Sequence, residues 1–186
     1  SNAGSDLNYL NWEKGFMSWW MSIDHKRIGL MYLGTMIFFF CIGGLLALAV
    51  RTELIAAGPT IMEANTYNMA FTLHGVIMIF LFIVPGVPAT LGNFLLPLMI
   101  GAKDVAFPRL NRLSYWIYVL GALCAFVAIY FKLDTGWTFY SPYSTKNAPA
   151  VMAATTAAFI LGFASILTGL NFLVTIHKMR APGLTW

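Results

Sequence analysis

The sequence predicts an all-α fold: a polytopic membrane protein with four transmembrane helices. Of the 186 residues, 59% are hydrophobic and only 10% are charged, and the mean hydropathy is +0.74. A soluble domain of this length needs far more charge on its surface. A membrane span needs about 20 apolar residues to cross a hydrocarbon core of about 30 Å. Four runs without Asp, Glu, Lys or Arg, of 23, 39, 19 and 31 residues, meet this requirement, at positions 28–50, 64–102, 113–131 and 147–177.

Each run predicts one helix, and we expect the four helices over residues 28–50, 66–100, 113–131 and 148–176. The second helix should be kinked or locally loosened, because it contains Pro85, Pro88 and Pro97. Small residues on the first and fourth helices permit close helix contact, and ordinary packing is the simplest reason for them. The segment KLDTGWTFYSPYSTKN, residues 132–147, is predicted to be an ordered external loop rich in aromatic side chains.

The distribution of Lys and Arg predicts the orientation in the membrane. Four spans put the N-terminus, the loop between the second and third helices, and the C-terminus on one side. That side carries eight of the eleven basic residues: Lys14, Lys26, Arg27, Lys103, Arg109, Arg112, Lys178 and Arg180. The other side carries Arg51, Lys132 and Lys146. Because Lys and Arg favour the cytoplasmic side, we expect both termini in the cytoplasm and the chain in a bacterial-type inner membrane.

The net charge of +4 thus reflects orientation in the membrane, and no nucleic-acid partner is expected.

Four tryptophans fall near the ends of spans, as in an interfacial aromatic belt: Trp19, Trp20, Trp116 and Trp137. Cys41 and Cys124 lie inside apolar runs and are expected to pack as small side chains without forming a disulfide.

The segments outside the spans complete the predicted organisation. No cleavable signal peptide is recognisable in the polar first residues. We expect a tag remnant at 1–3, a cytoplasmic segment at 4–27, the four-helix transmembrane region at 28–180, and a truncated cytoplasmic end at 181–186.

His74 is an ionisable residue inside the second predicted span, about eight residues or about 12 Å from its outer end. A polar side chain there usually faces a partner or a cavity. Two hypotheses remain open: an interhelical hydrogen bond, or ligation of a metal or heme. Gly75 favours the second because it leaves room for a flat ring. Arg51 is open in the same way, either reaching to the interface or holding a positive charge beside a cofactor.

A second polar group lies towards the predicted cytoplasmic end. Asn93 is 19 residues after His74, about 28 Å along a straight helix. Asp104 follows in the loop, eleven residues after Asn93, and Asn111 comes seven residues after Asp104. Asp104 is either an ordinary loop aspartate or a carboxylate that collects protons for a water chain held by the amides.

These features resemble subunit I of the heme–copper oxygen reductases, in particular the cytochrome c oxidase branch. The resemblance runs from about Trp19 to the C-terminus. The motifs that carry it are DHKRIGLMY (24–32), RTEL (51–54), TLHG (72–75), GNFLLPLMIGAKDVAFPRLN (92–111), TGWTFYSP (135–142) and LTGLNFLVTI (167–176). It implies that the chain is the first third of a twelve-helix bundle.

The resemblance implies a role for each unusual residue. His74 would be one of two axial ligands of a low-spin heme, with heme a the expected type. Arg51 would lie near the heme formyl group and Tyr67 near its propionates. Trp137 would donate towards a propionate of a second heme. Asp104 would be the entrance of a proton channel with Asn93, Asn111 and Asn171 as its asparagine gate and Tyr32 along its wall. Glu53 would lie near a structural cation site found in some members.

The implied chemistry is electron transfer from cytochrome c, through the low-spin heme, to a heme–copper site that reduces oxygen and pumps protons. The second heme, copper and the second axial histidine depend on later helices, so this chain alone should not be catalytically complete. Expected partners are those later helices, oxidase subunits II and III, and cytochrome c or a quinol. His25, in the segment before the first helix, and His177 are not expected to share the iron. The alternatives are the same part of a quinol oxidase, or a non-redox helical scaffold.

Overall fold

The computed structural model describes residues 8, 10, 15–146 and 148–184. The expected tag remnant and the last two residues lie outside this part. Within it, all regular structure is helical, and four helical stretches are long and apolar enough to cross a membrane. The first is α2 (His25–Glu53), the third is α5 (Pro108–Tyr130) and the fourth is α7 (Ala148–Lys178). The second stretch, Ala64–Ile100, is one continuous helix with several turn types.

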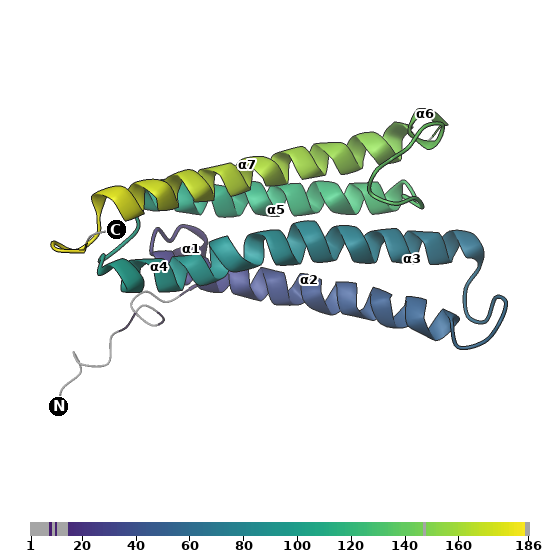
Figure 1. The fold of residues 1–186 in the computed structure, drawn as a ribbon, viewed down its shortest axis with the longest axis horizontal. Coiled ribbons are helices and arrows are strands. Elements are labelled where there is room, and N and C mark those ends of the chain that lie inside the picture. Colours follow the sequence, from purple (N-terminus) through teal and green to yellow (C-terminus); the bar gives the residue numbers. More distant parts are fainter. Residues whose placement is uncertain (1–7, 9, 11–14, 147, 185–186) are drawn as a thin grey trace.

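The four spans form two antiparallel pairs, as Figure 1 shows. One pair is α2 with the second span, and the other is α5 with α7. The short helix α1 (Phe16–Trp20) lies at the same end as the start of α5 and the end of α7. The loop after α2 and the short helix α6 (Tyr143–Lys146) lie at the opposite end. The fold class predicted from the sequence is therefore confirmed.

The second span changes helix type along its length. It begins as α3 (Ala64–Val76), continues through the π-helical segments η1 (Ile77–Ile83) and η2 (Gly86–Gly92), and ends as α4 (Asn93–Ile100). Proline lacks the N–H of an α-helical hydrogen bond, so the wider π turns occur where Pro85 and Pro88 interrupt that pattern. Gly101 ends α4 with φ of 68°, a left-handed conformation that suits glycine.

Local sequence signals set the helix ends. Asp24 caps α2, because its carboxylate accepts from the Lys26 backbone N–H at 2.7 Å. This cap places His25 in the first turn of α2 and not before the helix. Pro108 opens α5 at a position where its missing N–H costs nothing. The third span therefore begins five residues before the predicted start.

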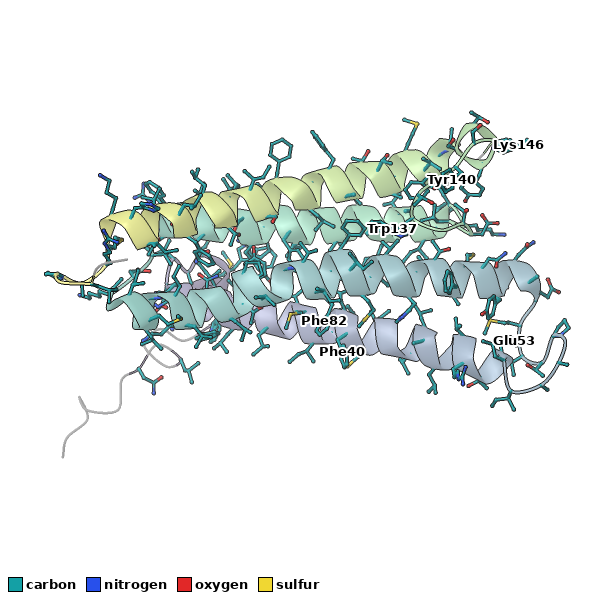
Figure 2. The ribbon with its side chains drawn as sticks, in the orientation of Figure 1. Phe40, Glu53, Phe82, Trp137, Tyr140 and Lys146 are labelled. Carbon is teal, nitrogen blue, oxygen red and sulfur yellow. The ribbon has the colours of Figure 1, made fainter. Side chains whose placement is uncertain are left out.

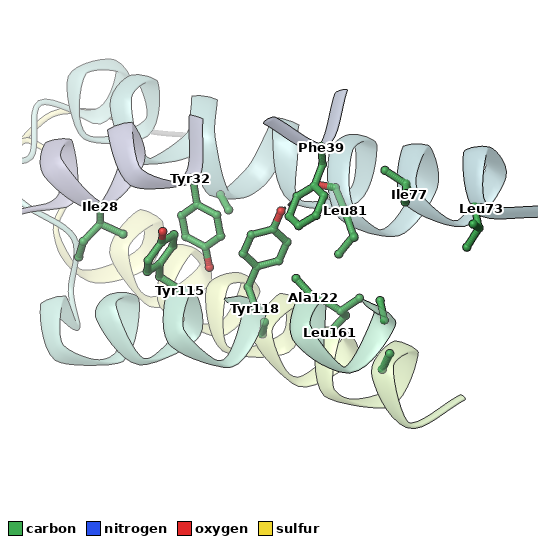
Figure 3. Close-up of a cluster of buried hydrophobic side chains, with 14 residues drawn as sticks. Ile28, Tyr32, Phe39, Leu73, Ile77, Leu81, Tyr115, Tyr118, Ala122 and Leu161 are labelled. Atoms are coloured by element: carbon green, nitrogen blue, oxygen red, sulfur yellow. Dashed lines mark hydrogen bonds between the residues drawn. The ribbon is translucent and has the colours of Figure 1, made fainter. Parts of the chain in front are cut away.

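The core lies where the two pairs meet, and Figure 3 shows its side chains. Tyr32 of α2 and Tyr118 of α5 are both 2% exposed and approach within 5.4 Å between ring centroids. The Tyr118 hydroxyl donates to the Leu81 carbonyl oxygen at 2.8 Å. Pro85 cannot give that carbonyl its α-helical hydrogen bond. Tyr118 thus satisfies the backbone where the second span departs from α-helix.

Candidate heme and proton-path sites

His74 lies in the last turn of α3, and its ring faces α2. Its Nδ1 is 2.9 Å from the Gly43 carbonyl oxygen. A carbonyl oxygen only accepts, so in the neutral ring Nδ1 carries the proton and donates it. Nε2 then keeps its lone pair, which is the arrangement that metal-binding histidines commonly show. The hydrogen bond and the ligand role, which the sequence left as alternatives, are compatible.

Glycines near His74 let α2 approach the second span closely and leave space beside the imidazole. A Cβ added to Gly43 would lie 2.7 Å from the Met78 sulfur, so glycine lets α2 come near the second span. A Cβ added to Gly75 would meet nothing within 4 Å, so the space beside the imidazole is open. Tyr67 lies seven residues before His74, about two turns along the same face. These residues fit a flat porphyrin held by one histidine of this chain.

No group of three or more His, Cys, Asp and Glu side chains lies close enough to hold a metal ion among the described residues. A heme that takes a single ligand from this chain needs no such group. Arg51, in the last turn of α2, is exposed.

Glu53 ends α2 and is buried under the loop that follows, at the end of the molecule labelled in Figure 2. One carboxylate oxygen accepts from the Thr60 N–H at 2.8 Å. The other accepts from the Ile61 and Met62 N–H groups at 2.8 and 3.0 Å. Backbone donors therefore hold this carboxylate in place, and it in turn fixes residues 54–62.

Trp137 lies in the loop between α5 and α7, on the side that faces the second span (Figure 2). Its ring packs edge-on against Phe80 of η1 at 5.8 Å. Both rings line an apolar cavity of about 260 Å³ between the second span, α5 and α7. Trp137 remains 54% exposed, so its indole is available to a group outside this chain.

At the other end of the bundle, Asp104 is partly exposed and has a histidine partner. His25 Nδ1 lies 2.9 Å from Asp104 Oδ1, and the same oxygen accepts from the Val105 N–H at 2.7 Å. The His25 side chain is 7% exposed against 38% for Asp104, so the carboxylate lies between water and the buried ring. Sequence reasoning missed this pairing, because 79 residues separate the two.

Behind Asp104, three fully buried asparagines come from three different spans. Asn111 Nδ2 donates to Asn93 Oδ1 at 2.6 Å, and Asn93 Nδ2 donates to the Ala89 carbonyl at 2.5 Å. Asn171 Oδ1 accepts from the Phe107 N–H at 2.8 Å, which ties the loop to α7. The Asn111 side-chain oxygen is buried without a donor, and such an oxygen suits an ordered water.

Hydroxyl groups continue the polar path. The hydroxyl oxygens of Tyr32 and Ser114 lie 3.1 Å apart, and the Ser114 hydroxyl donates to the Asn111 backbone carbonyl. Beyond them is a cavity of about 20 Å³, enough for about one water, lined in part by Tyr32, Ser165 and Thr168. Nearer the loop that contains Asp104, the Thr175 hydroxyl oxygen accepts from the Ala106 N–H at 2.9 Å.

Ser114, Thr168 and Thr175 were not singled out from the sequence. Short hydroxyl residues in spans usually bond to their own helix, and these three also do so. The spacing held the missing signal: Ser114 is three residues after Asn111, and Thr168 and Thr175 flank Asn171 at three and four residues. Each set occupies one helix face.

The fold and these two sites define a class of protein: a polytopic α-helical membrane protein with an available histidine nitrogen near one end and a buried polar path behind a carboxylate at the other. The comparisons with known proteins define the family. Residues 27–186 match the family described as cytochrome C and quinol oxidase polypeptide I, and the chain belongs to this family of heme–copper oxidase subunit I.

Relatives with different named donors are similar to the chain. The cytochrome c oxidase subunit 1 of Thermostichus vulcanus is 47% identical over 167 residues, which are 89% of this chain and 30% of that protein. A probable quinol oxidase subunit 1 of Staphylococcus haemolyticus is 39% identical, over 92% of this chain and 26% of that protein. The heme-copper oxidase subunit I+III of Aeropyrum pernix is 40% identical over 93% of this chain. The chain thus spans about a third of the length of such relatives or less.

Proposed function

We propose that this chain supplies one axial ligand of a low-spin heme and the entrance of a proton path in a terminal oxidase. The oxidase would transfer electrons from cytochrome c to a heme–copper site that reduces oxygen to water. The observation that carries the proposal is the His74 Nδ1 hydrogen bond to Gly43, which leaves Nε2 free. The family membership of residues 27–186 supports heme as the group that Nε2 would bind.

The heme would serve as an electron carrier, since an iron with two imidazole ligands has no open position for oxygen. His74 would hold it from α3, with the proton on Nδ1 fixed by Gly43. Arg51 and Tyr67 lie further towards the same end of the molecule, and we propose that they face the formyl and propionate edges. Trp137 would donate its indole N–H towards a propionate of the second heme. We further propose a structural cation near Glu53, for which the carboxylate oxygens of Glu53 would be the ligands that this chain supplies.

In the proposed proton path, Asp104 takes protons from water, and His25 orients the carboxylate. Asn93, Asn111 and Asn171 hold ordered water without titrating, and Tyr32 and Ser114 extend the path into the bundle. Moving one charge through a membrane potential of 100 mV stores about 2.3 kcal/mol. Proton uptake from only one side of the membrane would therefore conserve energy. We propose that this side is the cytoplasm.

Quinol is the second candidate donor, because a relative named as a quinol oxidase subunit is 39% identical to this chain. Cytochrome c is proposed first, since the relative named as cytochrome c oxidase is 47% identical. The remaining helices of subunit I and the other oxidase subunits would complete either enzyme. The family membership argues against a non-redox scaffold.

The test uses the complete oxidase that contains this chain. We expect His74→Ala to abolish the six-coordinate low-spin heme signal in the optical and electron paramagnetic resonance spectra, because iron loses one of its two ligands. His177→Ala is the matched control, since His177 lies at the exposed end of α7. An unchanged low-spin signal in an assembled His74→Ala oxidase would refute the ligand role.

A further inference from the structure

The end of the molecule that carries α1 has a partly exposed cluster of side chains that the two sites above do not use. The rings of Trp20 in α1 and Trp116 in α5 lie 3.9 Å apart between centroids. Arg112, one turn before Trp116, donates from Nη1 to the Met21 carbonyl oxygen at 2.6 Å. This contact and the ring stacking hold α1 against the start of α5.

The cluster continues along α5 in a fixed order. Arg112, Trp116 and Leu120 follow one another at intervals of four residues, so they lie on one helix face. Leu120 is 51% exposed and Trp20 is 42% exposed. Reading inward from the end of the span, the order is a cation, then two indoles, then an aliphatic side chain. A bilayer has the same order: phosphate, the interfacial region, and acyl chains.

The guanidinium of Arg112 has capacity to bind a further group. It has five N–H donors, and the bond to Met21 is its one hydrogen bond within the described part of the chain. A guanidinium with two free parallel donors binds a phosphate oxygen pair better than a lysine does. Arg112 is half-buried, and three exposed cations lie at the same end of the spans: Lys103, Arg109 and Lys178. The local field therefore favours an anionic headgroup over a zwitterionic one.

We propose that Arg112, Trp20, Trp116 and Leu120 form the binding site of one anionic phospholipid. The phosphodiester binds the free donors of Arg112, the glycerol region lies against the two indoles, and an acyl chain follows Leu120 along α5. The lipid fastens α1 to the bundle at the membrane surface. The proposed lipid site depends on the span ending near Arg112. It does not depend on heme binding or on the identity of the electron donor.

The experiment is native mass spectrometry of the oxidase containing this chain, purified from nanodiscs of phosphatidylglycerol and phosphatidylcholine. We expect the parent protein to retain phosphatidylglycerol preferentially. Arg112→Gln should lose about one tightly bound phosphatidylglycerol per complex, and Arg112→Lys should retain less than the parent. Trp116→Leu should also lose it, although this variant leaves the Arg112–Met21 bond possible. Lys178→Gln removes the same charge at the same end and should retain the lipid.

Three results would overturn the site. Equal retention by the parent and Arg112→Gln would mean that Arg112 serves only to hold α1. An equal loss in Lys178→Gln and Arg112→Gln would mean that the lipid responds to net charge alone. Another polypeptide segment covering Arg112 in the assembled oxidase would also contradict it. The low-spin heme spectra of these variants should be unchanged. Failure of the lipid proposal can therefore be distinguished from failure of the heme-ligand role proposed for His74.

Discussion

Asp104 shows how much a single residue depends on its neighbours. Its Oδ1 accepts from both His25 and the Val105 N–H, and the neighbouring loop is tied to α7 by Asn171. We predict that Asp104→Asn in the complete oxidase slows turnover about tenfold or more, equivalent to at least about 1.4 kcal/mol in the barrier. The reason is that an amide cannot take up and release a proton. Stopped-flow reduction of the low-spin heme should remain fast, while steady-state oxygen consumption falls.

Asp24→Asn is the matched control for Asp104, because it removes an acid at the same end of the molecule. Asn caps a helix about as well as Asp does, so α2 should keep its N-terminus. Turnover of this control should stay near the parent value. Equal slowing of heme reduction and turnover in Asp104→Asn would indicate a structural defect and contradict the proton role.

At the scale of the element, the second span contains three prolines and two π-helical segments, and Tyr118 of α5 donates a hydrogen bond to one of its backbone carbonyls. We predict that Tyr118→Phe lowers the free energy of unfolding by about 1 kcal/mol, because the Leu81 carbonyl loses a buried donor at 2.8 Å. Thermal denaturation of the purified oxidase measures the effect. Tyr130→Phe is the control, since that ring is 82% exposed. Equal stability of the two variants would show that the bond contributes nothing.

The four spans were predictable because charge-free runs and helix length are set by the membrane itself. The expected loosening by Pro85 and Pro88 was also confirmed, since it follows from a missing N–H. The π turns and the donor from Tyr118 were not predictable, because they depend on which side chain of another helix reaches a carbonyl. The same holds for His25 and Asp104: each is visible in the sequence, but their contact arises only when α2 and the loop before α5 meet. The roles proposed for His74, Arg51 and Trp137 remain predictions.

At the scale of the whole molecule, the arrangement of charge relative to the two ends predicts its orientation. Lys103 lies at the end with α1 and the start of α5, while Lys146 ends α6 at the opposite end. Because basic residues favour the cytoplasm, the Lys103 end should face inward. We predict that a cysteine at position 146 reacts with a membrane-impermeant maleimide in intact cells. A cysteine at position 103 should react only in inside-out vesicles.

The labelling needs a background without the native cysteines, since Cys41 is exposed and Cys124 partly so. Cys41→Ala and Cys124→Ala remove them, and neither lies in the candidate sites. The outcome bears on the energetics of the proposed enzyme. If Asp104 faces the cytoplasm and His74 lies towards the outer surface, protons and electrons approach the oxygen-reducing site from opposite sides, and each turnover separates charge. Labelling with the reverse pattern would place Asp104 outside, where proton uptake would dissipate the membrane potential, and the proposed direction of the path would be wrong.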